Sequence, residues 1–326
     1  MPGVRSSVAL DLKKSLKCKG RIMIDYTIRM LESPDDLSAV EDLQRLVWPG
    51  GDTEVVPVHM LVAAVRGGGL VMGAYTSSDG VATVPLLVGF VFGFPGFYFT
   101  PDGPRIKHCS HMLGVHPDHR DRGLGFSLKR AQWQMVRRQG VDRITWTYDP
   151  LQSRNGYLNI AKLGAVCNTY HREYYGVMRD GLNVGVPSDR FEVDWWVDSR
   201  RVNRRLSKHP RRQLELVDYI SGGVKIINPS QVEEGDLPRP SSLPLSNDLE
   251  RPSGKGEREA LLLVEIPSDF MSLKGADPSV ALEWRLHNRT IFEELFKRGY
   301  LVTDSVFQPG SHPRSFYILT HGLSTL

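Results

Sequence analysis

The sequence has few cysteines and no long apolar run. Only Cys18, Cys109 and Cys167 occur among 326 residues, and no two of them have CxxC spacing. Such a sparse, odd-numbered set favours neither a disulfide framework nor a zinc site, so no metal is expected. No apolar segment approaches the roughly 20 residues that cross a bilayer. We therefore expect a cytoplasmic protein with no signal peptide and no membrane partner.

The sequence also lacks a strong charge of either sign. Lys and Arg total 41 against 37 Asp and Glu, a net charge of +4, which is too small an excess to indicate a nucleic-acid partner. The densest basic run, residues 200–212, contains Val202 and Leu206 at helical spacing. That spacing favours a surface helix with a solvated basic face over a site for a phosphate backbone.

Strand and helix patterns alternate along most of the chain, which predicts a mixed α/β fold. A flexible basic tail is expected over residues 1–22 and a first domain over 23–198. A C-terminal α+β region is expected over 199–326, with a Pro-rich loop at 228–259. Within the first domain, strands are predicted at 26–31, 70–75, 86–94, 106–115, 143–148, 165–170 and 191–197, and the main helices at 35–48, 124–139 and 153–163.

Two parts of the chain share the order strand, helix, Lys-x-Gly, strand, strand. The Lys-x-Gly elements are Lys162-Leu163-Gly164 and Lys297-Arg298-Gly299, which lie 135 residues apart. One hypothesis is that the C-terminal region is a half-copy of the first fold. The alternative is coincidence, because Lys before Gly is favoured at any helix end. The strand order of the two segments distinguishes these explanations.

The segment Arg120-Asp121-Arg122-Gly123-Leu124-Gly125 lies between a predicted strand and a predicted helix. Glycines let backbone N–H groups approach a ligand, and the helix dipole favours an anion at the same place, so a pyrophosphate fits. A dinucleotide loop would need three glycines and a triphosphate loop would need Gly-Lys-Ser/Thr; neither occurs. A tight turn without a ligand is the alternative.

The segment from His111 through Gly125 resembles the signature of the GNAT acyl-CoA transferase superfamily, Gln/Arg-x-x-Gly-x-Gly/Ala. Arg120, Gly123 and Gly125 fill its fixed places, and the resemblance extends over about residues 25–198. The chain is also similar to a sparsely characterised group of acetyltransferases with a C-terminal extension. The segments that match this group are Lys162–Ala165, Gly181–Asn183, Pro187–Phe191 and, more loosely, Ala281–Arg285.

The resemblance implies a GNAT-like central mixed sheet with helices on both faces, opened between two strands to admit a thioester. It implies that the backbone of Leu113, Gly114 and Val115 holds pantetheine and that Arg120, Asp121, Arg122, Gly123, Leu124 and Gly125 bind the pyrophosphate of acetyl-CoA or another acyl-CoA. Asn155 could position a water or the pantetheine amides. As an alternative, Asn155 caps a helix.

His111 is a candidate for chemistry and Trp48 for acceptor binding. Alternation along the strand places His111 on the face of Cys109, Leu113 and Val115. Imidazole can accept a proton from an attacking amine at neutral pH, although His111 could instead be a hydrogen-bonded core residue. Trp48 could line the acceptor pocket or be an ordinary buried tryptophan.

The general acid that many members of the superfamily carry is missing. Its place, four residues before the helix-ending glycine, holds Ile160. Tyr157, one helical turn earlier, is the first substitute; Tyr170, Tyr174 or Tyr175 could also serve, or the thiolate could leave into water unaided. For Tyr157 the alternative is a tyrosine packed on the sheet with its hydroxyl at the surface.

The predicted function is transfer of an acyl group from acyl-CoA to the amine of a small molecule or amino acid. Two alternatives stay open: a non-catalytic acyl-CoA sensor, and a protein N-terminal or lysine acetyltransferase. The expected partners are an acyl-CoA donor and an amine acceptor, without nucleic acid. A homodimer is left open.

Overall fold

The computed structural model describes residues 12–15, 25–48, 55–76, 85–176, 185–207, 212–231, 237–241 and 260–322. The chain divides into two compact units, Met1–Ile144 and Thr145–Leu326, and this boundary falls inside the predicted domain 23–198. In the predicted tail 1–22, the structure describes only Leu12–Ser15, which form a strand. In the predicted loop 228–259 it describes 228–231 and 237–241. The motif Gly181–Asn183 lies outside the described residues.

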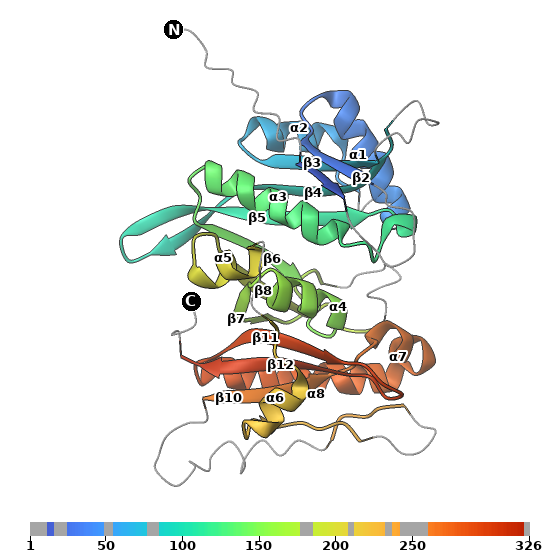
Figure 1. The fold of residues 1–326 in the computed structure, drawn as a ribbon, viewed down its shortest axis with the longest axis vertical. Helices are drawn as coiled ribbons and strands as arrows, with labels where there is room; N and C mark the ends of the chain where they lie inside the picture. The colour runs from blue at the N-terminus through green and yellow to red at the C-terminus, as the bar shows by residue number, and fades with distance from the viewer. Residues whose placement is uncertain are drawn as a thin grey trace. The chain divides into compact units, whose positions relative to one another are not determined.

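The first unit contains an antiparallel sheet with the strand order β1-β2-β3-β4-β5 (Figure 1). Consecutive strands of this unit therefore form an antiparallel meander. Strands β4 and β5 form a longer hairpin than expected, because pairing continues past Pro95-Gly96 as far as Thr100↔Gly103. The elements are β1 (Leu12–Ser15), β2 (Asp25–Met30), α1 (Pro34–Val47), α2 (Val58–Arg66), β3 (Leu70–Thr76), β4 (Leu87–Thr100), β5 (Gly103–Val115), the short 3-10 helix η2 (Pro117–His119) and α3 (Leu124–Arg138).

Helices cover both faces of this sheet. Helix α1 begins where Ser33 accepts a hydrogen bond from the Asp36 N–H and Pro34 occupies the first turn, a favoured N-terminal pattern. Its apolar face and Leu61 of α2 pack on Phe90 and Phe92 of β4. On the opposite face, α3 approaches so closely that a Cβ on Gly89 would lie 3.1 Å from Leu128. The sheet is thus buried between α1 and α2 on one side and α3 on the other.

The second unit contains strands in the order β6-β8-β7-β11-β12-β10-β9. Most pairs are antiparallel, and β9 joins β10 in parallel, so the predicted mixed α/β class is confirmed. The elements are β6 (Arg143–Tyr148), α4 (Ser153–Gly156), the π-helical segment η3 (Tyr157–Lys162), β7 (Val166–His171), β8 (Arg190–Trp196), α5 (Arg200–Leu206), α6 (Leu216–Ser221), β9 (Lys225–Ile226), β10 (Leu261–Ile266), α7 (Phe270–Ala276), α8 (Pro278–Lys297), β11 (Tyr300–Gln308) and β12 (Arg314–His321).

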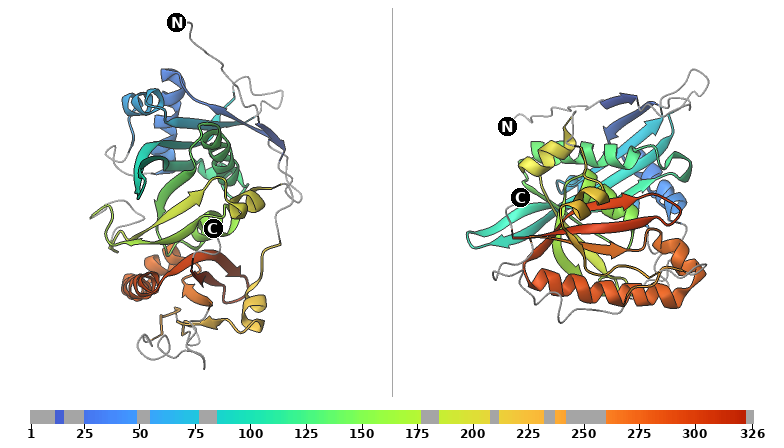
Figure 2. Two further views of the ribbon diagram at one scale, coloured as in Figure 1. Left: turned by 90° about the vertical axis from the view of Figure 1, so that its left-hand side faces the viewer. Right: turned by 60° about the horizontal axis from the view of Figure 1, so that its bottom comes forward.

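The strand order of this unit supports the half-copy hypothesis. The first half-copy (residues 143–196) has the order β6-β8-β7 and the second (residues 261–321) has the order β10-β12-β11, so each places its last strand between the other two. They meet where β7 pairs with β11 at Cys167↔Val302. A bulge follows each of these residues, after Cys167 and after Val302. Figure 2 shows α8 lying along one face of β10, β11 and β12.

The two helix-ending glycines strengthen this correspondence. Gly164 and Gly299 have φ values of 82° and 84°, in the left-handed region that glycine adopts most readily. The two glycines and the two bulges both lie 135 residues apart, and the strand order is the same in both segments. Coincidence at a Lys-x-Gly helix end does not account for that agreement.

The basic run after β8 differs in part from the prediction of a solvated face. Val202 and Leu206 of α5 are buried as expected. However, Arg201 donates to the carbonyls of Gly164 (2.9 Å) and Thr303, and Arg205 pairs with Asp304 at 2.6 Å. Burial lowers the pKa of Arg201 to about 10. Arg201 therefore connects the half-copies and Arg205 joins α5 to the second, so neither is part of a solvated basic face.

Candidate active site

A β-bulge in β5 sets the position of His111. Phe92 pairs with Met112 and Gly93 pairs with Ser110, so His111 is the extra residue on β5. The bulge reverses the alternation, and the prediction that Cys109 and His111 share a face with Leu113 and Val115 is wrong. Bulges of this kind re-aim a side chain and are common beside active sites.

The His111 ring lies beside two aromatic rings of β4. Its centroid is 5.8 Å from those of both Phe92 and Phe94. The residue is exposed, so it is not a core histidine. Desolvation by its neighbours nevertheless lowers its pKa. A lowered pKa keeps the imidazole neutral at pH 7, the form that can accept a proton.

His108 does not approach this face. It is buried on the α3 side, where its Nε2 lies 3.1 Å from Gln132 Nε2. Lys129 Nζ completes the cluster with bonds to Ser110 Oγ (2.8 Å) and Gln132 Oε1 (3.2 Å). Burial, reinforced by Lys129, lowers the pKa of His108 to about 3. His108 is therefore a neutral buried residue between β5 and α3.

The predicted anion loop has the backbone that such a site needs. Asp121 and Gly123 have φ values of 60° and 75°. Gly123 is the N-cap of α3 and supplies no side-chain cap; a helix N-terminus of this kind favours an anion. A Cβ on Gly123 would meet nothing within 4 Å, and one on Gly125 would meet only Leu113 Cδ2 at 3.6 Å. The loop therefore leaves open space in front of the helix end.

The arginines of the loop have different roles. Arg120 Nε donates to Val115 O at 3.2 Å and its Nη2 donates to Val47 O at 3.3 Å. Its guanidinium thus joins the ends of β5 and α1, whereas the sequence suggested a phosphate contact. The pKa of His119 is lowered by burial and by the neighbouring Arg122. The positive charge of Arg122 at this position favours an anion.

Trp48 lies on the same face of the sheet as His111. It follows the last residue of α1, and its ring is 6.0 Å from Phe90 in an edge-to-face arrangement. Phe90 and Phe92 are two positions apart on β4, so Trp48, Phe90, Phe92 and His111 form an aromatic row. Phe90 and Phe92 are buried, whereas His111 is exposed and Trp48 packs partly against the core.

Asn155 and Tyr157 belong to the second unit. Asn155 is exposed in α4, and the N-cap of that helix is Gln152, so Asn155 is not the cap. The Tyr157 hydroxyl donates to Gln213 Oε1 at 2.9 Å, so the tyrosine is not simply packed with a free hydroxyl. Ile160 is fully buried.

The helix that carries these residues is not the regular one predicted. The four residues of α4 are followed by the π-helical η3, with a hydrogen bond from Leu163 N to Leu158 O at 2.9 Å. The sequence has no local signal for this change. π-Helical turns are frequent at functional sites.

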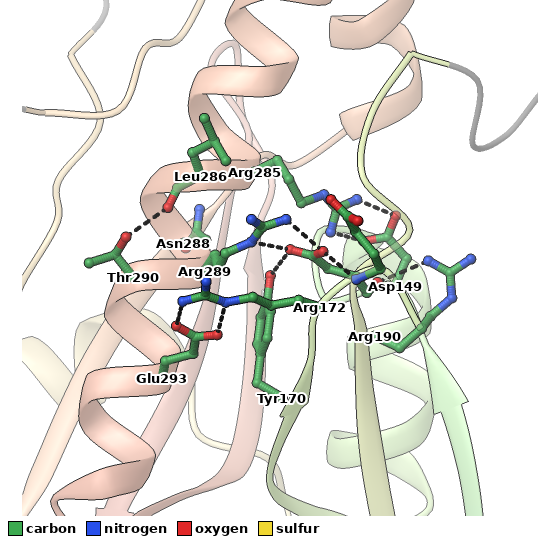
Figure 3. Close-up of polar contacts among 12 residues, drawn as sticks. Asp149, Tyr170, Arg172, Arg190, Arg285, Leu286, Asn288, Arg289, Thr290 and Glu293 are labelled. Carbon is green, nitrogen blue, oxygen red and sulfur yellow. Dashed lines mark hydrogen bonds and ion pairs between the residues drawn. The ribbon is translucent and has the colours of Figure 1, made fainter. Parts of the chain in front are cut away.

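Three arginine–carboxylate pairs connect the half-copies (Figure 3). The pairs are Arg285–Asp149 at 2.6 Å, Arg289–Asp189 at 2.8 Å and Arg172–Glu293 at 2.5 Å. Burial alone would raise the pKa of Asp189, but hydrogen bonds from Arg289 and Tyr170 outweigh it and lower the pKa. Sequence reasoning missed this network, although Arg285 and Arg289 occur four residues apart on one helix face.

Within the described ranges, no group of three or more His, Cys, Asp or Glu side chains is arranged to hold a metal ion. Across the same ranges, no helix combines the length and the apolar character that crossing a membrane requires.

Comparisons with known proteins give similarity to solved acetyltransferase structures over about half of this chain. No protein-family model matches, and no curated protein matches. The Arabidopsis thaliana NAA60 structure in complex with acetyl-CoA is 16% identical and has a TM-score of 0.41, covering 52% of this chain and 99% of NAA60. The Escherichia coli ribosomal-protein-S18-alanine N-acetyltransferase is 16% identical with a TM-score of 0.39, covering 53% and 95%. The NatC complex bound to Gag peptide and CoA is 14% identical with a TM-score of 0.41, covering 52% and 98%.

Proposed function

We propose that this protein transfers an acyl group from acyl-CoA to an amine. The observation that carries the proposal is the junction of β5 and α3. A bulged strand that presents His111 leads into a helix N-terminus with no side-chain cap and with open space over Gly123 and Gly125. A phosphate-bearing donor suits that helix end, and a neutral base on the preceding strand suits amine acylation.

The donor would bind along β5. Its pyrophosphate would accept hydrogen bonds from the N–H groups of Gly123 through Gly125 and would lie near the charge of Arg122. The backbone of Leu113, Gly114 and Val115 would hold the pantetheine arm. Asn155 is proposed to assist that arm or to position a water. The guanidinium of Arg120 supports the loop by fixing Val115 and Val47.

The reaction is direct attack without a covalent enzyme intermediate. The amine nitrogen forms a bond to the thioester carbonyl carbon, and the carbon–sulfur bond breaks. His111 accepts the amine proton, directly or through a water. The leaving thiolate takes a proton from Tyr157 or from water. The Tyr157 hydroxyl donates to Gln213 in the structure, so acting as the acid would require it to exchange that partner.

The aromatic row of Trp48, Phe90, Phe92 and His111 is the proposed wall of the acceptor site. Its flat apolar character suits the carbon skeleton of a small amine or amino acid. A protein N-terminus or a lysine side chain as acceptor, and a sensor that binds the donor without turnover, are the competing outcomes. A cytoplasmic location is proposed from the cysteine content.

Donor binding can be tested by calorimetric titration with acetyl-CoA. We expect binding to the wild type and a loss of at least tenfold in affinity for Gly125→Val, whose side chain would fill the space before the helix. The fold should persist, because a Cβ at Gly125 makes only an ordinary contact at 3.6 Å. Gly140→Ala is the matched control: this glycine has a φ of 73° at the other end of α3, so its substitution should cost stability and leave affinity unchanged. Absence of binding to the wild type would remove the proposal.

A further inference from the structure

The segment 149–156, which leads from β6 into η3, is held by side chains of the second half-copy. Arg285 of α8 makes a bidentate pair with Asp149, at 2.8 Å to Oδ1 and 2.6 Å to Oδ2. From β12, the Tyr317 hydroxyl donates to Pro150 O at 3.0 Å, and Ser315 Oγ lies 2.6 Å from Ser153 Oγ. Three side chains from the C-terminal region thus bond to Asp149, Pro150 and Ser153 of this segment.

Asp149 also bonds to the backbone of the segment. Its Oδ1 accepts the Leu151 N–H at 2.9 Å in addition to the Arg285 bond. At the other end of the segment, a Cβ on Gly156 would lie 2.5 Å from the Tyr317 hydroxyl oxygen. Only glycine therefore fits at Gly156, immediately before Tyr157. The position of Asn155 and the start of η3 follow from these contacts.

The Arg285–Asp149 pair is not explained by stability. The two side chains are 2% and 12% exposed, and a buried ion pair is commonly no more stabilising than apolar residues of the same volume. In addition, Arg285 Nε and the nearby Asn288 Oδ1 are buried with no hydrogen-bond partner in the structure, which carries a desolvation cost. The fixed geometry of a bidentate guanidinium–carboxylate pair is what distinguishes it from such residues.

We infer that Arg285 is a positioning residue: through Asp149 it fixes the segment 149–156, and with it Asn155 and Tyr157, for the acyl transfer proposed above. The inference rests on that proposed function for its catalytic consequence. The second half-copy is then an internal scaffold for the first, so substitutions in the C-terminal region are expected to change turnover.

The test compares Arg285→Met and Arg285→Lys with the full-length wild type. For Arg285→Met we expect kcat to fall at least tenfold while the affinity for acetyl-CoA stays within twofold, because the donor loop belongs to the first unit. Arg285→Lys keeps the charge and loses the bidentate geometry, so its kcat should lie between the two. Arg172→Met is the matched control, since it removes the exposed Arg172–Glu293 pair of the same interface and should leave kcat unchanged.

A further variant keeps the test decisive if Arg285→Met does not fold. The double variant Asp149→Asn/Arg285→Gln replaces the ion pair by a neutral hydrogen-bonded pair and should recover part of the kcat that Arg285→Met loses. If Arg285→Met does not fold, Arg285→Lys and the double variant decide the outcome. Unchanged kcat in the folded Arg285 variants overturns the inference.

Hydrogen exchange separates this inference from the proposed function. In Arg285→Met, the backbone amides of 151–162 should exchange at least tenfold faster than in the wild type, while those of α3 should not change. An inactive wild type with this exchange pattern refutes the proposed function alone. An active wild type whose Arg285 variants show neither effect refutes the positioning role alone.

Discussion

The two half-copies of the second unit share a strand order but differ in their helices. In the first, four α-helical residues pass into the π-helical η3. In the second, α8 runs for 20 residues, with Asp277 accepting the N–H groups of Ser279 and Val280 at its start. Tyr157 in the first corresponds to Phe292 in the second under the 135-residue offset, and Phe292 is fully buried.

This difference indicates a division of roles. A capped, regular helix with an apolar face gives a rigid support, whereas an irregular helix with polar contacts is typical of a functional segment. The copy with the candidate residues Asn155 and Tyr157 is the irregular one. The second copy supplies the arginines that hold it.

The largest effect on stability is expected for Phe292→Ala, which creates a cavity in the centre of the supporting copy. Phe292 packs against Phe191 and Tyr317, and a buried Phe→Ala change costs about 3–5 kcal/mol. Urea unfolding should show this loss, and Phe292→Leu should lose less. A cost below about 1 kcal/mol would show that the second copy is not the rigid support.

Arg289→Ala should cost about 3 kcal/mol, because it leaves the carboxylate of Asp189 buried without its ion-pair partner. Asp189 is completely buried, whereas Arg172 in the neighbouring pair is 61% exposed. Arg172→Ala should therefore cost no more than about 1 kcal/mol. Equal losses for the two variants in urea unfolding would contradict a buried connection between the copies.

Gly156→Ala tests how tightly the two copies pack. The added Cβ would meet the Tyr317 ring and hydroxyl, and overpacking of this kind costs about 1–3 kcal/mol. Gly275 of α7 has nothing within 4 Å of its would-be Cβ, so Gly275→Ala should be neutral or stabilising. Thermal unfolding should show a lower midpoint temperature for Gly156→Ala than for Gly275→Ala. A neutral effect of Gly156→Ala would contradict tight packing at this position.

The Asp189 pKa predicts a pH dependence of this connection. Because the folded pKa is lowered below the ordinary value of 3.8, the stabilisation is present above that value and is lost as the pH falls through the lowered pKa. In that window stability should fall by up to about 1.4 kcal/mol per pH unit. Between pH 5 and 3, the midpoint temperature of thermal unfolding should therefore fall more steeply with decreasing pH for the wild type than for Asp189→Asn. The same pH dependence of the midpoint in both proteins would contradict a role of Asp189 in this connection.

Tyr157→Phe should have the smallest effect on stability and a separate effect on turnover. It removes one partly buried hydrogen bond to Gln213, a change of about 1 kcal/mol. If the hydroxyl protonates the leaving thiolate, kcat should also fall by tenfold or more while donor affinity stays the same. Unchanged kcat would leave the proton to water and restrict Tyr157 to a structural role.

The sequence allowed prediction of features that depend on local patterns. Gly123 and Gly125 indicated the strand–loop–helix junction, and Gly164 with Gly299 indicated the half-copy whose strand order the structure supports. The junction is present in the structure, and the half-copy stays a hypothesis that the strand order supports. Both rest on glycine conformation and helix ends, which are local properties.

Other features depend on contacts between distant residues. The bulge at His111 arises from pairing with β4, so strict alternation placed Leu113 and Val115 on the wrong face. The hydrogen bond from Arg120 to Val47 O joins residues 73 positions apart. The ion pair of Arg285 with Asp149 joins residues 136 positions apart. No local pattern in the sequence indicates such partners.

The most direct test of the proposed function is release of free thiol from acetyl-CoA or succinyl-CoA in the presence of an amine panel. The panel should contain small amines, amino acids and peptides with free N-termini. We predict acceptor-dependent thiol release by the wild type, and a rate about 10²–10⁴-fold lower for His111→Ala at unchanged donor affinity. No release with any acceptor, or an equal rate for His111→Ala, would contradict the account.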